Sequence, residues 1–169
     1  MREILFRGKR KDTGEWVEAF SILKCQIEGT WQFLVGASKN ALMELDEHYN
    51  IHSAISEEDF LYYSVHPETM GQFVGFVDKN GKRVYEGDVI RFHKFRDEPD
   101  WTGAISYENG SYIVNGKMPL AYEKRIGKEA FYCPFEVALS GIDKGTIEVV
   151  GNIHDNPELQ EATDGKETN

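Results

Sequence analysis

Short apolar runs alternate with glycine-containing turns along most of this sequence. One such turn at residues 12–14 and a second at residues 28–30 divide residues 3–36 into three apolar or aromatic stretches. Stretches of this length, bounded by turn residues, are typical of β-strands joined as hairpins. The pattern therefore predicts a three-stranded antiparallel meander over about residues 3–36.

The pattern changes in the next segment of the chain. Over residues 39–49, Leu42, Leu45 and Tyr49 recur at the spacing of one helix face, with acidic residues between them. This spacing predicts a short amphipathic helix. Residues 60–65 have the aromatic and β-branched composition of a strand.

From residue 70 the strand pattern returns with clear turn signals. The pairs Asn80-Gly81 and Asn109-Gly110 predict hairpins with type I′ turns, which need positive φ at both central residues. Gly87 predicts a tight turn at positive φ. Residues 115–132, which contain glycine, proline and scattered charges, are expected to form a long connection. Nine residues are predicted to form the core of this region: Phe73, Phe76, Val84, Ile90, Phe92, Ile105, Tyr112, Val149 and Ile153.

These elements define a mainly β (α+β) fold. We expect an N-terminal antiparallel meander with a short helix over residues 1–65. The boundary is placed there because Pro67 disfavours helix in the residue before it and so ends the preceding element. Five or six short strands over residues 66–159 predict a small SH3-like barrel-type lobe. The polar residues 160–169 are expected to be a disordered tail.

Composition and charge narrow the class of protein. The 169 residues are 40% hydrophobic and 28% charged, which is typical of a globular protein rather than a disordered one. No apolar run approaches the roughly 20 residues of a membrane span, and the N-terminus lacks a secretory signal pattern. We therefore expect a cytoplasmic protein. The net charge is −10, so the chain lacks the broad basic surface of a protein that coats DNA.

Two cysteines, Cys25 and Cys133, have apolar or aromatic neighbours in sequence. They can form at most one bridge, and their spacing shows no disulfide framework. Core thiols are favoured over a redox or nucleophilic role, which requires a lowered thiol pKa.

Two segments resemble the YopX-like family of phage and prophage proteins. They are residues 67–90, PETMGQFVGFVDKNGKRVYEGDVI, and residues 148–159, EVVGNIHDNPEL, which we call the signature segments. The opening residues 6–9, FRGK, together with Trp16, also resemble the family's first strands. The resemblance implies a mainly β fold and a phage-associated origin in a bacterial host cell. It implies no activity, because the family has no catalytic residues to transfer.

Histidines offer one candidate metal pair. His48 and His52 have the i, i+4 spacing of two ligands on a helix. Glutamate does not follow the first histidine, as it does in the usual zinc-protease motif. A solvated helix end is therefore favoured, and we predict no metal and no cofactor.

Four acidic residues are the remaining candidates for an enzyme site. Glu86 and Asp88 flank Gly87, and Asp155 and Glu158 lie in the second signature segment. Such carboxylates can hold a hard cation or act as an acid–base pair, but they also stabilise turns by accepting backbone hydrogen bonds. The sequence leaves both interpretations open and favours turn stabilisation, so we assign no catalytic residue and favour a protein that is not an enzyme.

Two modes of binding also compete. A strand over residues 89–95 places Arg91, His93 and Phe95 on one face, and Phe92, Lys94 and Arg96 on the other, which suits single-stranded nucleic acid if one face is open. A second mode is apolar contact between subunits through exposed rings. The candidates are Trp31, Trp101, Tyr62 and Tyr63, although a place in the core is favoured for these rings.

The preferred function is a non-enzymatic phage accessory protein that acts by protein–protein contacts. We expect self-association into a homo-oligomer, with a host or phage protein as a further partner. The alternatives are a module that binds single-stranded nucleic acid, which the net charge disfavours, and an enzyme with an unrecognised acidic site.

Overall fold

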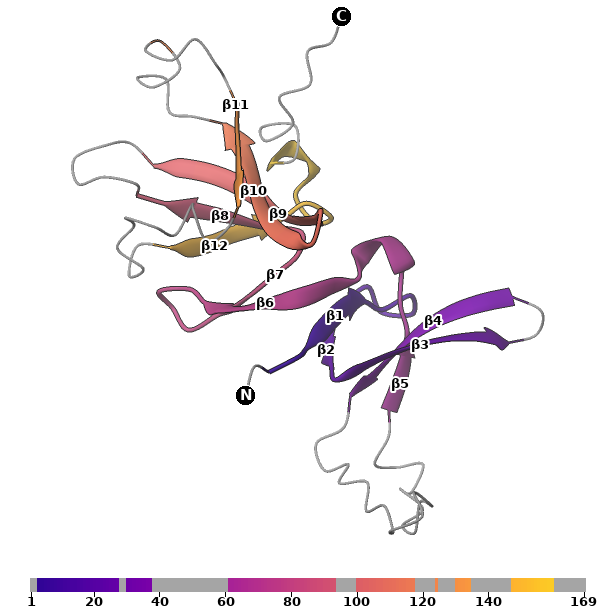
Figure 1. Cartoon of the computed structure of the whole chain (residues 1–169). Helices are drawn as coiled ribbons and strands as arrows, with labels where there is room; N and C mark the ends of the chain where they lie inside the picture. Colours follow the sequence, from indigo (N-terminus) through magenta and orange to yellow (C-terminus); the bar gives the residue numbers. More distant parts are fainter. Residues whose placement is uncertain are drawn as a thin grey trace, which may run out of the picture. The chain divides into compact units, whose positions relative to one another are not determined.

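The computed structural model describes residues 3–27, 30–37, 61–93, 100–117, 124, 130–134 and 147–159 (Figure 1). Within β4 and β11, and in parts of β3, β5 and β10, the description is of the backbone. In these residues the structure is mainly β, and every strand pair is antiparallel. The mainly β fold expected from the sequence is confirmed. The predicted helix over 39–49 and the tail 160–169 lie outside the described residues, and the SH3-like detail stays a prediction.

The chain divides into two compact units, Met1–Gln72 and Phe73–Asn169. The boundary after residue 65 that the sequence suggests stays a prediction. In the structure, the segment that follows Pro67 contacts β1 (Phe6–Lys9). Thr69 accepts a hydrogen bond from the Lys9 amide at 2.9 Å, and Gly71 pairs with Arg7 in the β ladder. The short 3₁₀ helix η1 (Pro67–Thr69) therefore belongs with the first unit.

The first unit contains two hairpins rather than one continuous meander. β1 pairs with β2 (Trp16–Ala19), and Gly14 at the turn has a φ of 72°. β3 (Ser21–Ile27) pairs with β4 (Thr30–Ala37) in a separate sheet, to which β5 (Leu61–Ser64) adds. The stretch read as one strand is interrupted by a bend at Phe20, which separates β2 from β3.

A small core closes the first unit. Ala19 and Val65 are fully buried, and Val17, Tyr63 and Met70 pack against them. Gly8 lies so close to this core that a Cβ there would sit 3.1 Å from Val65.

The second unit is built on a five-stranded antiparallel sheet in the order β11-β10-β9-β8-β12 (Figure 1). Its strands are β8 (Asp88–Phe92), β9 (Trp101–Glu108), β10 (Ser111–Lys117), β11 (Ala130–Pro134) and β12 (Glu148–Asn152). The predicted long connection over 115–132 is wrong at both ends. β10 continues through Lys117, and Ala130 already pairs with it in β11.

Gly116 explains why the connection was mispredicted. It was read as a loop residue, but it lies within β10 opposite Gly103. A Cβ at Gly116 would sit 2.1 Å from the Thr102 carbonyl oxygen, so the close approach of two strands requires glycine here.

The two Asn-Gly turns differ. Asn109 and Gly110 have φ values of 51° and 85°, which confirms positive φ at both residues of that hairpin. In the turn between β6 (Gly71–Val77) and β7 (Arg83–Tyr85), only Gly81 is left-handed, at 77°. The type I′ prediction for Asn80-Gly81 is therefore wrong, because the Asp78 side chain organises this turn in another way.

A hydrophobic cluster in the second unit includes residues of β8, β9 and β10 that share one face of the sheet. Val84, Ile90, Phe92 and Ile105 were predicted there and are buried. The remaining members of the cluster are not among those nine residues: Val74, Trp101, Val114 and Ile147. For Trp101 the sequence already favours a position in the core. Phe76, Tyr112 and Val149 pack against it while partly exposed, Phe73 is buried beside Tyr85, and Ile153 is partly buried. No helix in the described residues is long and apolar enough to cross a membrane.

Candidate functional site

The tight turn between β7 and β8 lies near the end of the first signature segment. Gly87 has a φ of 79°, as its position predicted. Its amide donates to the Ile105 carbonyl at 2.8 Å, and its carbonyl accepts from the Ile153 amide at 2.9 Å. Asp88 is 1% exposed, and its Oδ2 accepts a hydrogen bond from the Tyr85 amide at 2.8 Å. This carboxylate therefore closes the turn from inside the protein.

Asn152 brings the second signature segment onto this turn. Its Nδ2 donates to Oδ1 of Asp88 at 3.3 Å, and its Oδ1 accepts from the His154 amide at 2.9 Å. A Cβ on Gly87 would lie 3.2 Å from Asn152 Nδ2, so glycine is needed for this approach as well as for its φ. Asn152 is only 6% exposed. The two signature segments thus meet in a buried polar contact, which we call the Asp88–Asn152 lock.

The four candidate carboxylates have different positions. Asp88 belongs to the lock, while Glu86 is partly buried on the same turn. Asp155 and Glu158 are exposed, and Glu158 accepts a hydrogen bond from Asn156 Nδ2 at 3.2 Å. In the part of the chain that the structure describes, no three His, Cys, Asp or Glu side chains gather as metal ligands. The contacts of Asp88 are those of a group that stabilises a turn.

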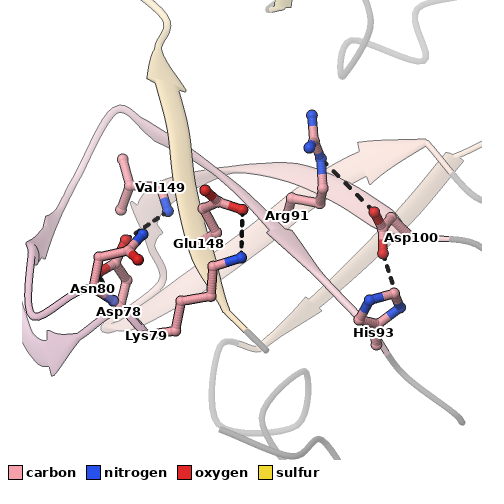
Figure 2. A network of polar contacts seen from close by, with 8 residues as sticks. All are labelled: Asp78, Lys79, Asn80, Arg91, His93, Asp100, Glu148 and Val149. Atoms are coloured by element: carbon pink, nitrogen blue, oxygen red, sulfur yellow. Dashed lines mark hydrogen bonds and ion pairs between the residues drawn. The ribbon is translucent and has the colours of Figure 1, made fainter. Parts of the chain in front are cut away.

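A second buried carboxylate, Asp78, joins the β6–β7 turn to the edge of β12 (Figure 2). Its Oδ1 accepts from the amides of Asn80 and Lys82 at 2.8 and 2.9 Å. Its Oδ2 accepts from the Val149 amide at 3.0 Å. One side chain, 5% exposed, thus holds its own turn and a strand 71 residues away.

The environment of Asp78 has opposing effects on its pKa. Burial raises the pKa by disfavouring the charged form. The backbone hydrogen bonds from Val149, Lys82 and Asn80, together with the positive charge of Lys82, lower it more. The net result is a pKa below the ordinary value for aspartate, so the carboxylate is ionised in neutral solution.

Charged side chains on β8 and its neighbours pair with one another at the surface (Figure 2). Asp100 contacts His93 Nδ1 at 2.8 Å and Arg91 Nε at 3.9 Å. Glu148 contacts Lys79 Nζ at 2.7 Å, and this hydrogen bond is the main cause of the lowered pKa of Glu148. Arg91, His93 and Lys79 therefore each have a carboxylate beside them.

The described residues among the candidates for nucleic-acid binding lie on opposite faces of the sheet. Phe92 points into the core and is 2% exposed, whereas Arg91 and His93 are exposed. Lys94, Phe95 and Arg96 lie outside the described residues. The outward side of β8 and the residue after it thus present Arg91 and His93 with Asp100 between them, and no described ring stands open beside them for base stacking.

The aromatic candidates for subunit contact are partly corrected. Trp101 is 4% exposed and stacks on Phe92 at 6.4 Å between ring centroids, so it is a core residue. Tyr63 is partly buried beneath Arg10, whose guanidinium lies 4.2 Å from its ring centroid. The side chains of Trp31 and Tyr62 lie outside the description.

Other sequence candidates are not placed by the structure. His48 and His52 fall outside the described residues. Cys25 lies in β3 and Cys133 in β11, and only their backbone is described.

Sequence reasoning missed the roles of Asp78 and Asn152. Aspartate before Lys-Asn-Gly was a usable signal, because its side chain can accept hydrogen bonds from amides two residues ahead. No local signal identifies Asn152, whose partner lies 64 residues away.

The fold and these contacts define a mainly β protein in which signature residues hold turns and strand edges together. The chain belongs to the YopX family, since residues 5–161 match the family described as YopX protein. This confirms the resemblance noted in the sequence. Among solved structures, the chain is similar to the crystal structure of protein EF1440 from Enterococcus faecalis. The two share 18% identity with a TM-score of 0.40, over 92% of this chain and 96% of the other. The comparison with curated proteins found no match.

Proposed function

We propose that this protein is a non-enzymatic phage accessory protein that acts through protein–protein contacts and self-associates in the cytoplasm of a bacterial host. The observation that supports it is a group of exposed apolar side chains in the first unit. Phe20 is 60% exposed, Ile4 58% and Ile22 38%. Burying apolar area against another subunit yields about 25 cal/mol per Å². We call these three residues the first-unit apolar group.

The three side chains come from neighbouring parts of the backbone. Phe6 pairs with Ala19, so Ile4, just before β1, and Phe20, just after β2, lie at the same end of this strand pair. Ile22 follows in β3. Exposed apolar residues this close together along the backbone can form a contact surface, whereas single exposed ones are ordinary.

β3 adds a second feature of a contact surface. It is the end strand of the sheet β3-β4-β5, and among the described residues no strand pairs with its outer edge. It is seven residues long, with no proline and with Lys24 as its one charged residue. Proteins usually protect edge strands by short length, proline, lysine or bulges, and of these β3 has a single lysine. A long edge beside exposed apolar side chains is suited to contact with another chain.

Light scattering tests self-association directly. We expect a mass above that of the monomer at tens of micromolar protein and about 0.15 M salt, where the Debye length is about 8 Å. Lower salt should weaken association, because each chain carries a net charge of −10. A strict monomer under all these conditions contradicts the proposal.

Matched variants locate the surface. Phe20→Ser combined with Ile22→Ser should lower the mass towards the monomer. Tyr107→Ser is the control, because Tyr107 is 56% exposed but lies in the second unit. Equal loss of association in the control would show that the first-unit apolar group is not the contact.

A further inference from the structure

Three backbone groups along the outer edge of β12 and the residue before it form hydrogen bonds with parts of the chain outside the sheet. The Lys79 amide donates to the Ile147 carbonyl at 2.8 Å, and the Val149 amide donates to Asp78 Oδ2 at 3.0 Å. Farther along, the Asn152 amide donates to Asn156 Oδ1 at 3.3 Å. β12 is the last strand of its sheet, so these groups face away from β8. A turn and two side chains take the place that a sixth strand would fill.

Asp78 and Lys79 contact the edge of β12 in the way that a neighbouring strand would, although they lie in a turn. In an antiparallel ladder, the carbonyl of one residue and the amide two residues on face the same neighbour. Here Ile147 and Val149 offer such a carbonyl and amide. The Lys79 backbone amide supplies the donor to Ile147. The carboxylate of Asp78 replaces the backbone acceptor for the Val149 amide (Figure 2).

The sequence of this edge is suited to pairing with itself. Ile147, Val149 and Val150 are β-branched and have high strand propensity. In an antiparallel pair of two β12 strands with Val149 opposite Val149, Glu148 is set against Val150 of the other copy, which lies at the irregularity between Val149 and Gly151. The register that sets Glu148 against Glu148 is disfavoured, because like charges directly opposite are destabilising.

We propose that the Asp78–Lys79 turn is a built-in stopper on the outer edge of β12, and that without it this edge pairs with the β12 edge of a second copy of the chain. Natural sheets commonly cover or interrupt such edges to avoid uncontrolled pairing. The stopper is in the second unit and acts independently of the first-unit apolar group.

The sharpest variant is Asp78→Asn. The amide keeps one oxygen for the Asn80 and Lys82 amides, but it turns an NH₂ group towards the Val149 amide, which is itself a donor. The turn is thus retained while the contact with the edge is lost. Hydrogen bonds to charged groups are strong enough that the Val149 amide should exchange with solvent about ten- to a hundredfold faster in dilute protein.

Light scattering then reports pairing. The mass of Asp78→Asn should rise with concentration above that of the wild type. Adding Val149→Pro should abolish the rise, because proline removes the outward amide and blocks strand addition at an edge. Asp12→Asn is the charge control, since Asp12 is an exposed carboxylate in a turn of the first unit and should behave as wild type.

Two results would overturn the proposal. The first is a wild-type mass for Asp78→Asn at every concentration. The second is equal association with and without Val149→Pro, which would place the contact elsewhere. If Asp78→Asn fails to fold, Lys79→Pro replaces it. Proline is favoured at the second position of this turn and removes the donor to Ile147, so the same rise in mass is expected.

Discussion

Removing the Asp88 carboxylate should destabilise the second unit strongly. Asp88→Ala removes two hydrogen bonds to a charged acceptor, from the Tyr85 amide at 2.8 Å and from Asn152 at 3.3 Å. It also leaves the Tyr85 amide buried without that acceptor. A hydrogen bond to a charged group contributes about 1.5–3 kcal/mol, and an unsatisfied buried donor costs about 1–3 kcal/mol. The bond from Tyr85 and the donor left unsatisfied there describe one and the same loss. Since the longer bond also lies at the weak end of its range, we expect a total loss of about 3 kcal/mol.

The second partner of the lock permits a double-mutant cycle. Asn152→Ala alone should cost about 2 kcal/mol, because it frees the His154 amide as well as Asp88. Combined with Asp88→Ala, the loss should be smaller than the sum by about 1 kcal/mol, as is usual for side chains in direct contact. A coupling near zero would show that the 3.3 Å contact contributes nothing to folding.

Urea unfolding followed by Trp101 fluorescence measures the loss of stability of the second unit. The chain has three tryptophans, and Trp101 is the one that lies in the second unit. All variants are therefore compared in a background with Trp16→Phe and Trp31→Phe. A loss of about 3 kcal/mol corresponds to a fall in melting temperature of roughly 12 °C or more for a unit of this size.

Asp155→Ala is the matched control, because Asp155 is an exposed carboxylate in the same signature region. It should change stability by less than about 0.5 kcal/mol. If Asp88→Ala costs less than about 1 kcal/mol, or no more than Asp155→Ala, the lock is not a folding element. The signature would then need a functional explanation instead.

The remaining predictions concern backbone strain, pH, packing and nucleic acid. Gly87→Ala should cost about 1 kcal/mol more than Gly81→Ala in urea unfolding, because both residues have positive φ but only Gly87 faces another group within 4 Å. The pKa of Asp78 is lower in the folded state, so its stabilisation is present above the unfolded pKa of about 3.9 and is lost as the pH falls through the folded value. Urea unfolding between neutral pH and acid should show this loss in the wild type and a smaller one in Asp78→Asn. Trp101→Ala should cost about 3–5 kcal/mol in melting experiments, since the ring is buried against Phe92. Gel shifts with single-stranded DNA should show no binding even at about 50 mM salt, because Asp100 contacts both Arg91 and His93; a shift that Arg91→Ala removes would contradict this.

The sequence predicted best where a short stretch of chain sets its own geometry. Asn109-Gly110 and Gly87 adopt the predicted positive φ because the preference belongs to these residues and not to their surroundings. The Asn80-Gly81 turn failed because a side chain two residues earlier, Asp78, supplies acceptors that fix another turn. Turn type is thus predictable only when neighbouring side chains do not compete for the same amides.

Long-range contacts explain the other differences. Gly116 has the composition of a loop residue, and only the approach of Thr102 shows why a strand needs it. The lock joins Asp88 to Asn152 across 64 residues, and no periodicity or spacing links such positions. The sequence identified Asp88 as a turn residue but gave no indication of the partner that buries it.

The burial of these contacts bears on where function lies in the YopX family. Asp78, Asp88 and Asn152 are each 6% exposed or less and are engaged with the protein's own backbone or with one another. A buried group that already accepts internal hydrogen bonds can contact a partner only if the fold opens, at the cost of leaving donors unsatisfied. Substituting these residues therefore tests folding, and a loss of activity in such variants would not identify a binding site. Partner contacts have to be sought at exposed positions such as Phe20, where a substitution changes the surface while the lock and the edge of β12 stay intact.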